Sequence, residues 1–357
     1  MPDPSLIKNA NVSSLKSSLI QPFRTALGEH KTLDNLLFSI ELHDGTKGFG
    51  EAAIATHITG ETIEKTWKNL EGAASDLVGR DASDYLNISC RLHERFSKNK
   101  SVIAAVECAV MDALTRQWKI PLWKFFGNAP QKLTTDITIV IAGLEETVES
   151  VRQFYRQGFR VFKVKIGRDA ALDFKRVSAL RRLAPDSKIY LDVNQGYSAK
   201  ETLAFLKSLK KVDIEPSLVE QPVAKGDWEG LKKVSRETKI PVCADESVSS
   251  LSDAVKCIKE RAASVINIKL MKSGIFEARE IALLAKANGI RLMIGGMMET
   301  SLAMTAAAHM AAGLGFFDYV DLDTPFFIQN GRRGNLFLSS RGIYDLNNVK
   351  AGVGITP

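Results

Sequence analysis

The sequence predicts a (β/α)7β barrel of the TIM-barrel type, class α/β, with an N-terminal α+β capping domain ahead of it. From Leu133 onward, short apolar runs typical of strands alternate with segments of helical spacing. One strand and one helix of a parallel barrel take roughly 25 residues, since about 250 residues build eight such units. The chain repeats at this interval, which is typical of a parallel sheet covered by helices.

The expected barrel helices lie at 145–157, 169–183, 198–210, 227–237, 249–260, 274–288 and 300–314. A strand precedes each of them, and an eighth strand at 316–323 completes the series. The period therefore predicts eight strands joined by seven helices.

The first part of the chain does not follow this alternation. Residues 36–43 alternate between apolar and polar side chains, and Asp44 and Gly45 offer a hairpin turn into the next strand. Helical spacing follows at 61–78 and 101–118. An antiparallel sheet followed by helices indicates a separate α+β unit.

We therefore divide the chain into three parts. They are a capping domain at 1–128, the catalytic barrel at 129–325 and a C-terminal segment at 326–357. The last segment has glycine-rich turns and short strands, and we expect it to pack back on the capping domain.

Composition places the chain among ordinary globular proteins. Of its 357 residues, 45% are hydrophobic and 25% are charged, with a net charge of +7. No stretch interleaves basic with aromatic residues, which disfavours nucleic-acid binding. The four cysteines lie far apart, as expected for thiols in a reducing compartment. The N-terminus lacks the apolar core of a signal peptide, and 302–314 is too short to cross a bilayer, so we expect a soluble, cytoplasmic protein.

Five charged residues recur through the barrel at steps of 24 to 28 residues: Lys165, Asp192, Glu220, Asp245 and Lys269. Each lies near the end of a strand-like run. Because the carboxyl ends of parallel strands meet at one rim, the five side chains should lie around one axis. The spacing thus predicts an enzyme active site.

Asp192, Glu220 and Asp245 suggest a hard divalent cation, Mg²⁺ or Mn²⁺, because such ions prefer oxygen ligands. Three carboxylates in one pocket would repel each other, and a cation relieves that cost. Asn194 and Glu246 lie near enough in sequence to orient the ligands.

Lys165 and Lys269 stand on opposite sides of the metal strands and suggest two acid/base groups. One base on each face of a metal-stabilised enediolate permits 1,1-proton transfer and inversion of a stereocentre, whereas one idle base leaves elimination or cycloisomerisation. A useful lysine base needs a pKa lowered to about 7–8. We expect Lys163, as a neighbouring like charge, to lower the pKa of Lys165.

Asp321 and Asp323 are expected to face inward from the last strand. Rim salt bridges are one interpretation. The other is capture of a substrate ammonium group, since the two carboxylates are opposite in sign to it. A substrate with a carboxylate on the metal and an ammonium several bonds away is a short peptide.

Taken in order, these residues resemble the enolase superfamily, in its muconate-lactonizing-enzyme-like subgroup. The matching motifs are KVK at 163–165, DVNQ at 192–195, EQP at 220–222, ADES at 244–247 and NIKLMKSG at 267–274. The DLD at 321–323 narrows the resemblance to the dipeptide epimerases, the group that includes L-Ala-D/L-Glu epimerase.

The resemblance implies a role for each candidate residue. It implies that Asp192, Glu220 and Asp245 bind Mg²⁺ and that Lys165 and Lys269 act as the acid and base. Lys163 supports catalysis and contacts the substrate. Ammonium capture falls to Asp321 and Asp323, with Thr138 and Met298 near the dipeptide.

Two positions depart from the resemblance. The loop FRTALG at 23–28 ends in Gly28, where the Ala-Glu epimerases typically have an arginine that pairs with the glutamate side chain. Gly28 cannot make that bidentate contact, and Arg24 lies four residues earlier. We therefore expect an apolar or broad second residue in the dipeptide. In addition, Gly274 follows Lys272-Ser273, where a glycine pair is usual.

The expected function is a Mg²⁺-dependent dipeptide epimerase that inverts the α-carbon of the C-terminal residue of L-Ala-Xaa dipeptides. The alternatives are L-Ala-D/L-Glu epimerase itself, o-succinylbenzoate synthase or muconate cycloisomerase activity, and a catalytically silent binding protein. The expected partner is a small dipeptide, with no nucleic acid and no membrane. The resemblance also leaves a homo-oligomer open.

Overall fold

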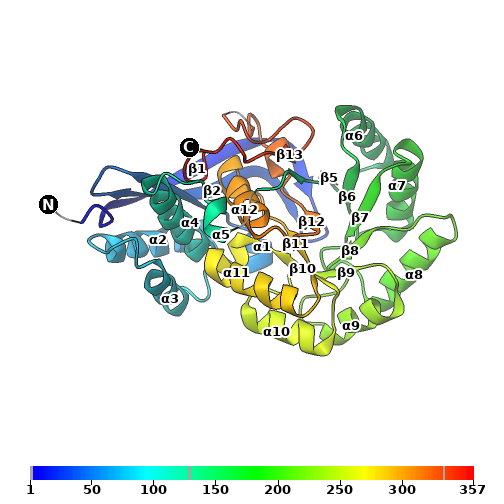
Figure 1. The fold of residues 1–357 in the computed structure, drawn as a ribbon. Coiled ribbons are helices and arrows are strands. Elements are labelled where there is room, and N and C mark those ends of the chain that lie inside the picture. Colours follow the sequence, from blue (N-terminus) through cyan, green and yellow to red (C-terminus); the bar gives the residue numbers. More distant parts are fainter. Residues whose placement is uncertain (1–2, 128–129, 333) are drawn as a thin grey trace.

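The computed structural model describes residues 3–127, 130–332 and 334–357. The capping domain begins with a three-stranded antiparallel sheet in the order β1 (Ile7–Arg24), β2 (Glu29–Leu42) and β3 (Lys47–Ala52) (Figure 1). The long strand β1 is missing from the sequence prediction. Its side chains are mostly half-buried or exposed, so few apolar residues mark the strand.

The helices of this domain are α1 (Thr56–Thr59), α2 (Ile63–Leu77), α3 (Tyr85–Arg95), α4 (Lys100–Gln117) and α5 (Trp123–Phe126), of which α2 and α4 pack on the sheet. Helix α4 is buried along almost its whole length. It packs closely on β3 because Gly48 and Gly50 lie at the contact. A Cβ atom at either glycine would clash with an α4 carbonyl oxygen, that of Ala109 or that of Ala105.

The second domain is a barrel of eight parallel strands in sequence order, β5 (Ile137–Ile139), β6 (Val161–Lys165), β7 (Lys188–Asp192), β8 (Leu218–Glu220), β9 (Val242–Ala244), β10 (Val265–Ile268), β11 (Arg291–Ile294) and β12 (Tyr319–Val320). A main-chain hydrogen bond of 3.0 Å from Asp136 N to Val320 O joins the first strand region to the last. The predicted barrel is confirmed.

The helices between these strands are α6 (Leu144–Gln157), α7 (Ala170–Leu183), α8 (Ala199–Lys210), α9 (Trp228–Glu237), α10 (Leu251–Glu260), α11 (Leu270–Ala287) and α12 (Ser301–Leu314). They form an outer layer around the strands (Figure 1). The largest shift from the prediction is at α11, which begins at Leu270 and not at residue 274. Gly274, with φ of 77°, kinks this helix after its first turn.

The C-terminal segment contacts both domains. Strand β13 (Ile343–Tyr344) pairs with β4 (Leu133–Thr134), after the 3₁₀ turn η1 (Thr324–Phe326). On the capping side, Val353 N donates to Asp112 Oδ1 at 2.7 Å. The domain boundaries at 128 and 325 remain predictions.

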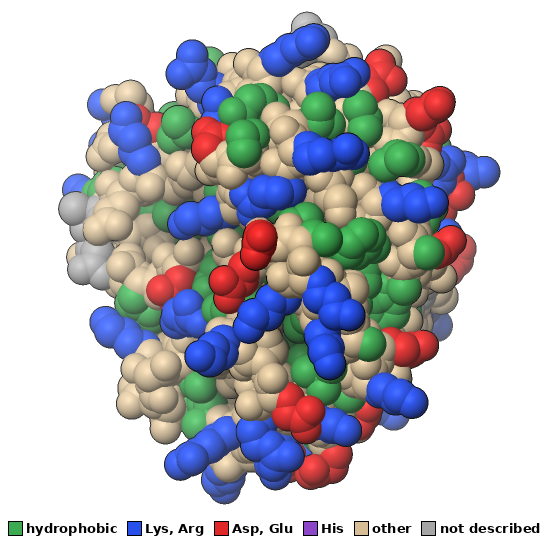
Figure 2. Space-filling view, turned by 90° about the vertical axis from the view of Figure 1, so that its right-hand side faces the viewer, with side chains coloured by type: hydrophobic (Ala, Val, Ile, Leu, Met, Phe, Trp, Pro, Cys, Tyr) green, Lys and Arg blue, Asp and Glu red, His purple; other side chains and the backbone are tan. Residues whose placement is uncertain are grey.

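Surface charges are mixed over the face shown in Figure 2, where Lys and Arg side chains lie scattered among acidic and apolar ones. Such a face lacks the continuous basic stripe of a nucleic-acid binder. Of the helices in the described ranges, none combines the length and the apolar character that a bilayer crossing requires.

Candidate active site at the carboxyl rim of the barrel

The five evenly spaced residues come together at the carboxyl ends of five successive strands. Lys165, Asp192 and Glu220 are the last residues of β6, β7 and β8. Asp245 directly follows β9, and Lys269 directly follows β10. The strand register places Lys165 beside Asp192 and Asp192 beside Glu220.

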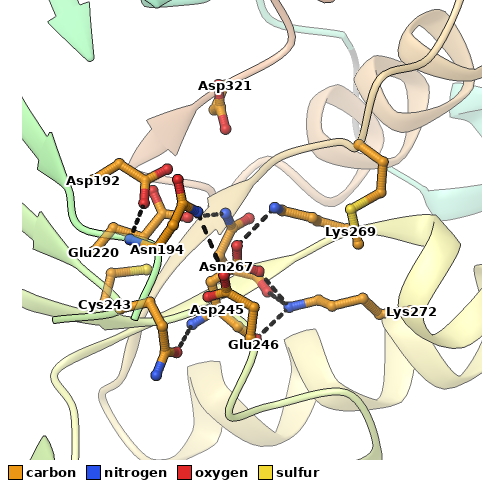
Figure 3. Close-up of polar contacts among 12 residues, drawn as sticks. Asp192, Asn194, Glu220, Cys243, Asp245, Glu246, Asn267, Lys269, Lys272 and Asp321 are labelled. Atoms are coloured by element: carbon orange, nitrogen blue, oxygen red, sulfur yellow. Dashed lines mark hydrogen bonds and ion pairs between the residues drawn. The ribbon is translucent and has the colours of Figure 1, made fainter. Parts of the chain in front are cut away.

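Each of the two lysines lies against one of the carboxylates. Lys165 Nζ is 2.6 Å from Asp192 Oδ2, and Lys269 Nζ is 2.7 Å from Asp245 Oδ2. Figure 3 shows Lys269 reaching Asp245 from the side opposite Asp192. Lys165 and Lys269 therefore approach the cluster of three carboxylates from two sides.

The three carboxylates fit a hard divalent cation. All are buried, with Asp192 and Glu220 0% exposed and Asp245 1% exposed. Burial and the neighbouring charge of Asp192 raise the pKa of Glu220 to about 8. In the described ranges, Glu220 Oε2 has no correctly oriented hydrogen-bond donor, although Lys163 Nζ lies 2.7 Å away. A cation bound between these oxygens would supply the missing partner.

Lys163 lies at the centre of the acidic group. Its Nζ is 3.1 Å from Asp192 Oδ2, 2.7 Å from Glu220 Oε2 and 2.6 Å from Asp321 Oδ2. Burial opposes the charge on this ammonium, but the surrounding carboxylates outweigh it and raise the pKa of Lys163. Lys163 is therefore held as a cation between three acids.

The pKa of Lys269 is also higher than its ordinary value, opposite to what a catalytic base was expected to need. Burial works to lower this pKa, but the charges of Asp245 and Glu220 raise it by more. The sequence spacing did not show that each lysine would contact a carboxylate. Neutralisation of these carboxylates by a metal ion would remove the cause of the shift.

Asn194 and Glu246 lie beside the candidate ligand Asp192. Asn194 N donates to Asp192 Oδ1 at 3.1 Å, and its side-chain amide donates to Glu246 Oε1 at 3.4 Å. A third residue, Asn267, donates from Nδ2 to Glu220 Oε1 at 2.7 Å. These contacts fix the orientation of the carboxylates.

Lys272 is a site residue that the sequence reasoning missed. Its buried Nζ donates to Asp245 Oδ1 at 2.9 Å, to the Asp245 carbonyl at 2.7 Å and to the Asn267 carbonyl at 2.8 Å (Figure 3). The available signal was its position three residues after Lys269 at a helix start, which puts the two lysines on one side of the helix.

The remaining candidates line a small cavity of about 50 Å³ beside the lysines. Thr138, Met298, Asp321 and Asp323 all contribute to its wall. Asp323 Oδ2 accepts a hydrogen bond from Thr138 N at 2.6 Å. The two aspartates follow β12 and do not belong to it, because the strand ends at Val320.

The capping domain closes this cavity with Phe23, Thr25, His30, Ala55 and Ile58. Residues 25–28 form a turn in which Thr25 N donates to Gly28 O at 2.9 Å. Arg24 does not line the cavity; its guanidinium Nε is 3.3 Å from Glu29 Oε1. Arg24 therefore does not replace the arginine missing at Gly28.

Comparison with known proteins matches both domains to one family. Residues 146–357 match the enolase C-terminal domain-like family, and residues 9–127 match the N-terminal domain of mandelate racemase / muconate lactonizing enzyme. The hydrophobic dipeptide epimerase of Citrifermentans bemidjiense is 44% identical over 98% of both chains.

Two solved structures with substrates are also similar to this chain. The substrate-liganded L-Ala-D/L-Glu epimerase from Bacillus subtilis has a TM-score of 0.94 at 33% identity and covers 98% of both chains. The Enterococcus faecalis dipeptide epimerase, complexed with Mg and L-Leu-L-Tyr, has a TM-score of 0.92 at 31% identity, over 99% of this chain and 100% of that one. The present chain thus belongs to the enolase superfamily, with both domains of the mandelate racemase / muconate lactonizing enzyme family, and it is an isomerase.

Proposed function

We propose that this isomerase is a Mg²⁺-dependent dipeptide epimerase that inverts the α-carbon of the C-terminal residue of L-Ala-Xaa dipeptides, with Xaa apolar. The observation that carries the proposal is the placement of Lys165 and Lys269 on two sides of the buried carboxylates, with Asp321 and Asp323 farther along the same rim. The similar dipeptide epimerases support the reaction class.

Asp192, Glu220 and Asp245 would hold the metal ion. When bound, it supplies Lewis-acid stabilisation of the negative charge that develops on the substrate carboxylate. Asn267 and Lys272 keep the side chains of Glu220 and Asp245 in place through the bonds described above.

The two lysines move the proton. One lysine, neutral when it acts, takes the α-proton as an ammonium hydrogen and leaves the bonding pair on the planar substrate. The other lysine, charged when it acts, gives a proton to the opposite face. Each lysine changes protonation state once per turnover, so the net reaction is inversion with no atom gained or lost.

Asp321 and Asp323 would bind the substrate amino group. Both line the cavity beside Thr138. Burial and the charge of Asp321 raise the pKa of Asp323 to about 7, so a positive charge nearby would stabilise the ionised carboxylate. An ammonium group meets that requirement, whereas a neutral or acylated nitrogen does not.

The capping domain supports an apolar second residue. Phe23, Ile58 and Met298 line the cavity, and Arg24 is engaged by Glu29. Position 28 is a glycine, so it offers no guanidinium to bind a glutamate side chain. The similarity to a hydrophobic dipeptide epimerase supports the same preference.

Deuterium exchange tests the proposal directly. The protein is incubated with Mg²⁺ in D₂O and with dipeptides that vary at the second position, including L-Ala-L-Leu, L-Ala-L-Phe and L-Ala-L-Glu. We expect deuterium at the α-carbon of the second residue and formation of the L-Ala-D-Xaa product, fastest for apolar residues. A library without any α-exchange rules the proposal out.

Two alternatives lead to different results in the same assay. Preference for L-Ala-L-Glu would assign L-Ala-D/L-Glu epimerase activity proper. The substrates of o-succinylbenzoate synthase and muconate cycloisomerase carry no ammonium group, so Asp323→Asn would leave those activities intact. We expect Asp323→Asn instead to weaken dipeptide turnover strongly.

A further inference from the structure

A buried carboxylate below the proposed ammonium site accepts no hydrogen bond from the described residues. It belongs to Asp136, which directly precedes β5 and is 1% exposed. Within the part of the chain that the structure describes, neither Oδ1 nor Oδ2 has a hydrogen-bond donor. Because strand side chains alternate, Asp136 lies on the same inward face as Thr138, one layer deeper in the barrel. A buried carboxylate without a donor is costly, so the position needs an explanation.

Asp136 lies beside the two aspartates after β12. The main-chain bond from Asp136 N to Val320 O brings the two ends of the barrel sheet together. One carboxylate oxygen from each of Asp136, Asp321 and Asp323 lies within 4.8 Å of the other two. An ion centred among such oxygens lies within about 2.8 Å of each, near the distances at which hard cations bind oxygen.

The protein supplies only part of the positive charge that this group needs. Lys163 contacts Asp321, but it shares its ammonium with Asp192 and Glu220. Asp323 receives the Thr138 amide, which carries no full charge. Among the described residues, no Lys, Arg or His forms an ion pair with Asp136.

Charge balance favours a singly charged ion. Besides this trio, the buried acids of the rim are Asp192, Glu220, Asp245, Glu246 and Glu299, and the buried ammonium groups are those of Lys163, Lys165, Lys269 and Lys272. Burial and the charge of Glu51 raise the pKa of Glu299 to about 8, so this carboxyl group is mostly protonated near pH 7. If the other seven acids are ionised, they exceed the lysines by three. A divalent ion on Asp192, Glu220 and Asp245 leaves one negative charge, which one monovalent cation balances.

We propose that Asp136, Asp321 and Asp323 form a binding site for a dehydrated monovalent cation of the size of Na⁺ or K⁺, and that the substrate ammonium displaces this ion. The second clause rests on the proposed function, whereas the first does not. Asp136 is then a positioning residue that holds a cation deep in the barrel and does not itself reach the cavity.

Thermal unfolding of the full chain in constant Mg²⁺ tests the site without any turnover. Tetramethylammonium chloride is replaced by KCl or NaCl at constant ionic strength, because tetramethylammonium is too large for a site of this size. We expect the unfolding midpoint to rise by several degrees with K⁺ or Na⁺. An equal midpoint in all three salts overturns the proposal and assigns a shared carboxyl proton to the trio instead.

Asp136→Asn provides the matched variant, because it removes one charge and keeps the size of the side chain. Its midpoint should be independent of the cation. Asp186→Asn is the control: it removes an exposed carboxylate near Arg160 and should keep the full response to K⁺. If Asp136→Asn does not fold, the linewidth of the sodium NMR signal is measured with the wild-type protein. A bound sodium ion broadens this signal, and tetramethylammonium should not reverse the broadening because it is too large to displace the ion. A signal that the protein does not broaden would contradict a sodium site.

Competition tests the displacement. In the wild-type protein, K⁺ should raise the KM of L-Ala-L-Leu several-fold with kcat unchanged, and this dependence should vanish in Asp136→Asn. A KM independent of K⁺ in a protein that K⁺ stabilises overturns the displacement. Absence of any dipeptide turnover would refute the proposed function, but cation-dependent stability would still establish the site.

Discussion

Lys272 Nζ binds Asp245 twice, through the carboxylate Oδ1 at 2.9 Å and the main-chain carbonyl at 2.7 Å. Lys269 Nζ contacts the other carboxylate oxygen, Oδ2, at 2.7 Å. Asp245 is therefore held at both carboxylate oxygens and at its main-chain carbonyl. We propose proton transfer only for Lys269, whereas Lys272 is bound to main-chain oxygens at the helix start and orients Asp245.

Lys272→Gln should lower the affinity for Mg²⁺ by about 10–100-fold, the usual cost of losing a residue that orients a metal ligand. Calorimetric titration with Mg²⁺ measures this affinity. Lys286→Gln, an exchange at the far end of the same helix α11, is the control and should bind Mg²⁺ as the wild type does. An unchanged Mg²⁺ affinity in Lys272→Gln would show that Asp245 is oriented without the contacts of Lys272.

Lys165→Ala and Lys269→Ala should each reduce the rate of inversion by about 10²–10⁴-fold, because each removes the acid/base group on one face. Each variant should still exchange the α-hydrogen of one enantiomer of the dipeptide in D₂O, and the two variants should prefer opposite enantiomers. Mass spectrometry of both enantiomers measures the exchange. The same preference in both variants would contradict the two-sided arrangement.

Removal of the metal should make stability depend on pH through Glu220. Its pKa is raised to about 8 in the folded protein, against 4.5 for the free group. The folded state therefore binds a proton that the unfolded state releases, so stability falls as pH rises from about 4.5 to 8. Urea unfolding in EDTA at pH 5 and pH 8 measures the difference.

Glu220→Gln is the control for this pH dependence, since an amide does not titrate. In EDTA it should lose less stability between pH 5 and pH 8 than the wild type. Saturating Mg²⁺ should likewise reduce the loss in the wild type, because the metal replaces the proton. A wild type whose stability rises over this interval in EDTA would be inconsistent with a protonated Glu220.

Gly28→Arg should move the second-residue preference toward glutamate. The turn at 25–28 adjoins the cavity through Thr25, and a guanidinium there could bind a side-chain carboxylate in bidentate fashion. The ratio of kcat/KM for L-Ala-L-Glu to that for L-Ala-L-Leu should increase by at least tenfold. Gly28→Leu, which adds bulk without charge, should not increase it.

Gly50→Ala should destabilise the protein by about 1–3 kcal/mol, the typical cost of overpacking. The added Cβ would clash with the Ala105 carbonyl of α4. Gly226→Ala is the control, because no heavy atom lies within 4 Å of a Cβ there. Chemical denaturation measures both, and equal stability of the two variants would show that α4 can move away from β3.

Sequence periodicity predicted the barrel well because each strand–helix unit buries an apolar strand under one helix. The same period brought Lys165, Asp192, Glu220, Asp245 and Lys269 to one rim. The sequence analysis did not predict strand β1, because most of its side chains are only half-buried or exposed. It also did not predict helix α3, because few of its residues are buried. Local pattern carries little information about elements of this kind.

The sequence also did not reveal contacts between residues that lie far apart along the chain. Lys272 binds the residue after β9 from the start of α11, and Asp136 meets Asp321 and Asp323 only because the barrel closes. Neither relationship corresponds to a regular spacing. The direction in which the pKa of Lys269 shifts could not be read from the sequence for the same reason, since it depends on which carboxylates lie near the ammonium.

The kink at Gly274 has a consequence for how the two domains depend on each other. The buried Glu107 of α4 accepts hydrogen bonds from Ile275 N at 2.6 Å and Phe276 N at 3.2 Å, directly after the kink. The capping domain thus provides the N-terminal cap of the helix segment that follows Lys269 and Lys272. Exchange of capping domains between relatives would therefore alter the position of Lys269, which we propose as a catalytic residue, as well as the choice of substrate.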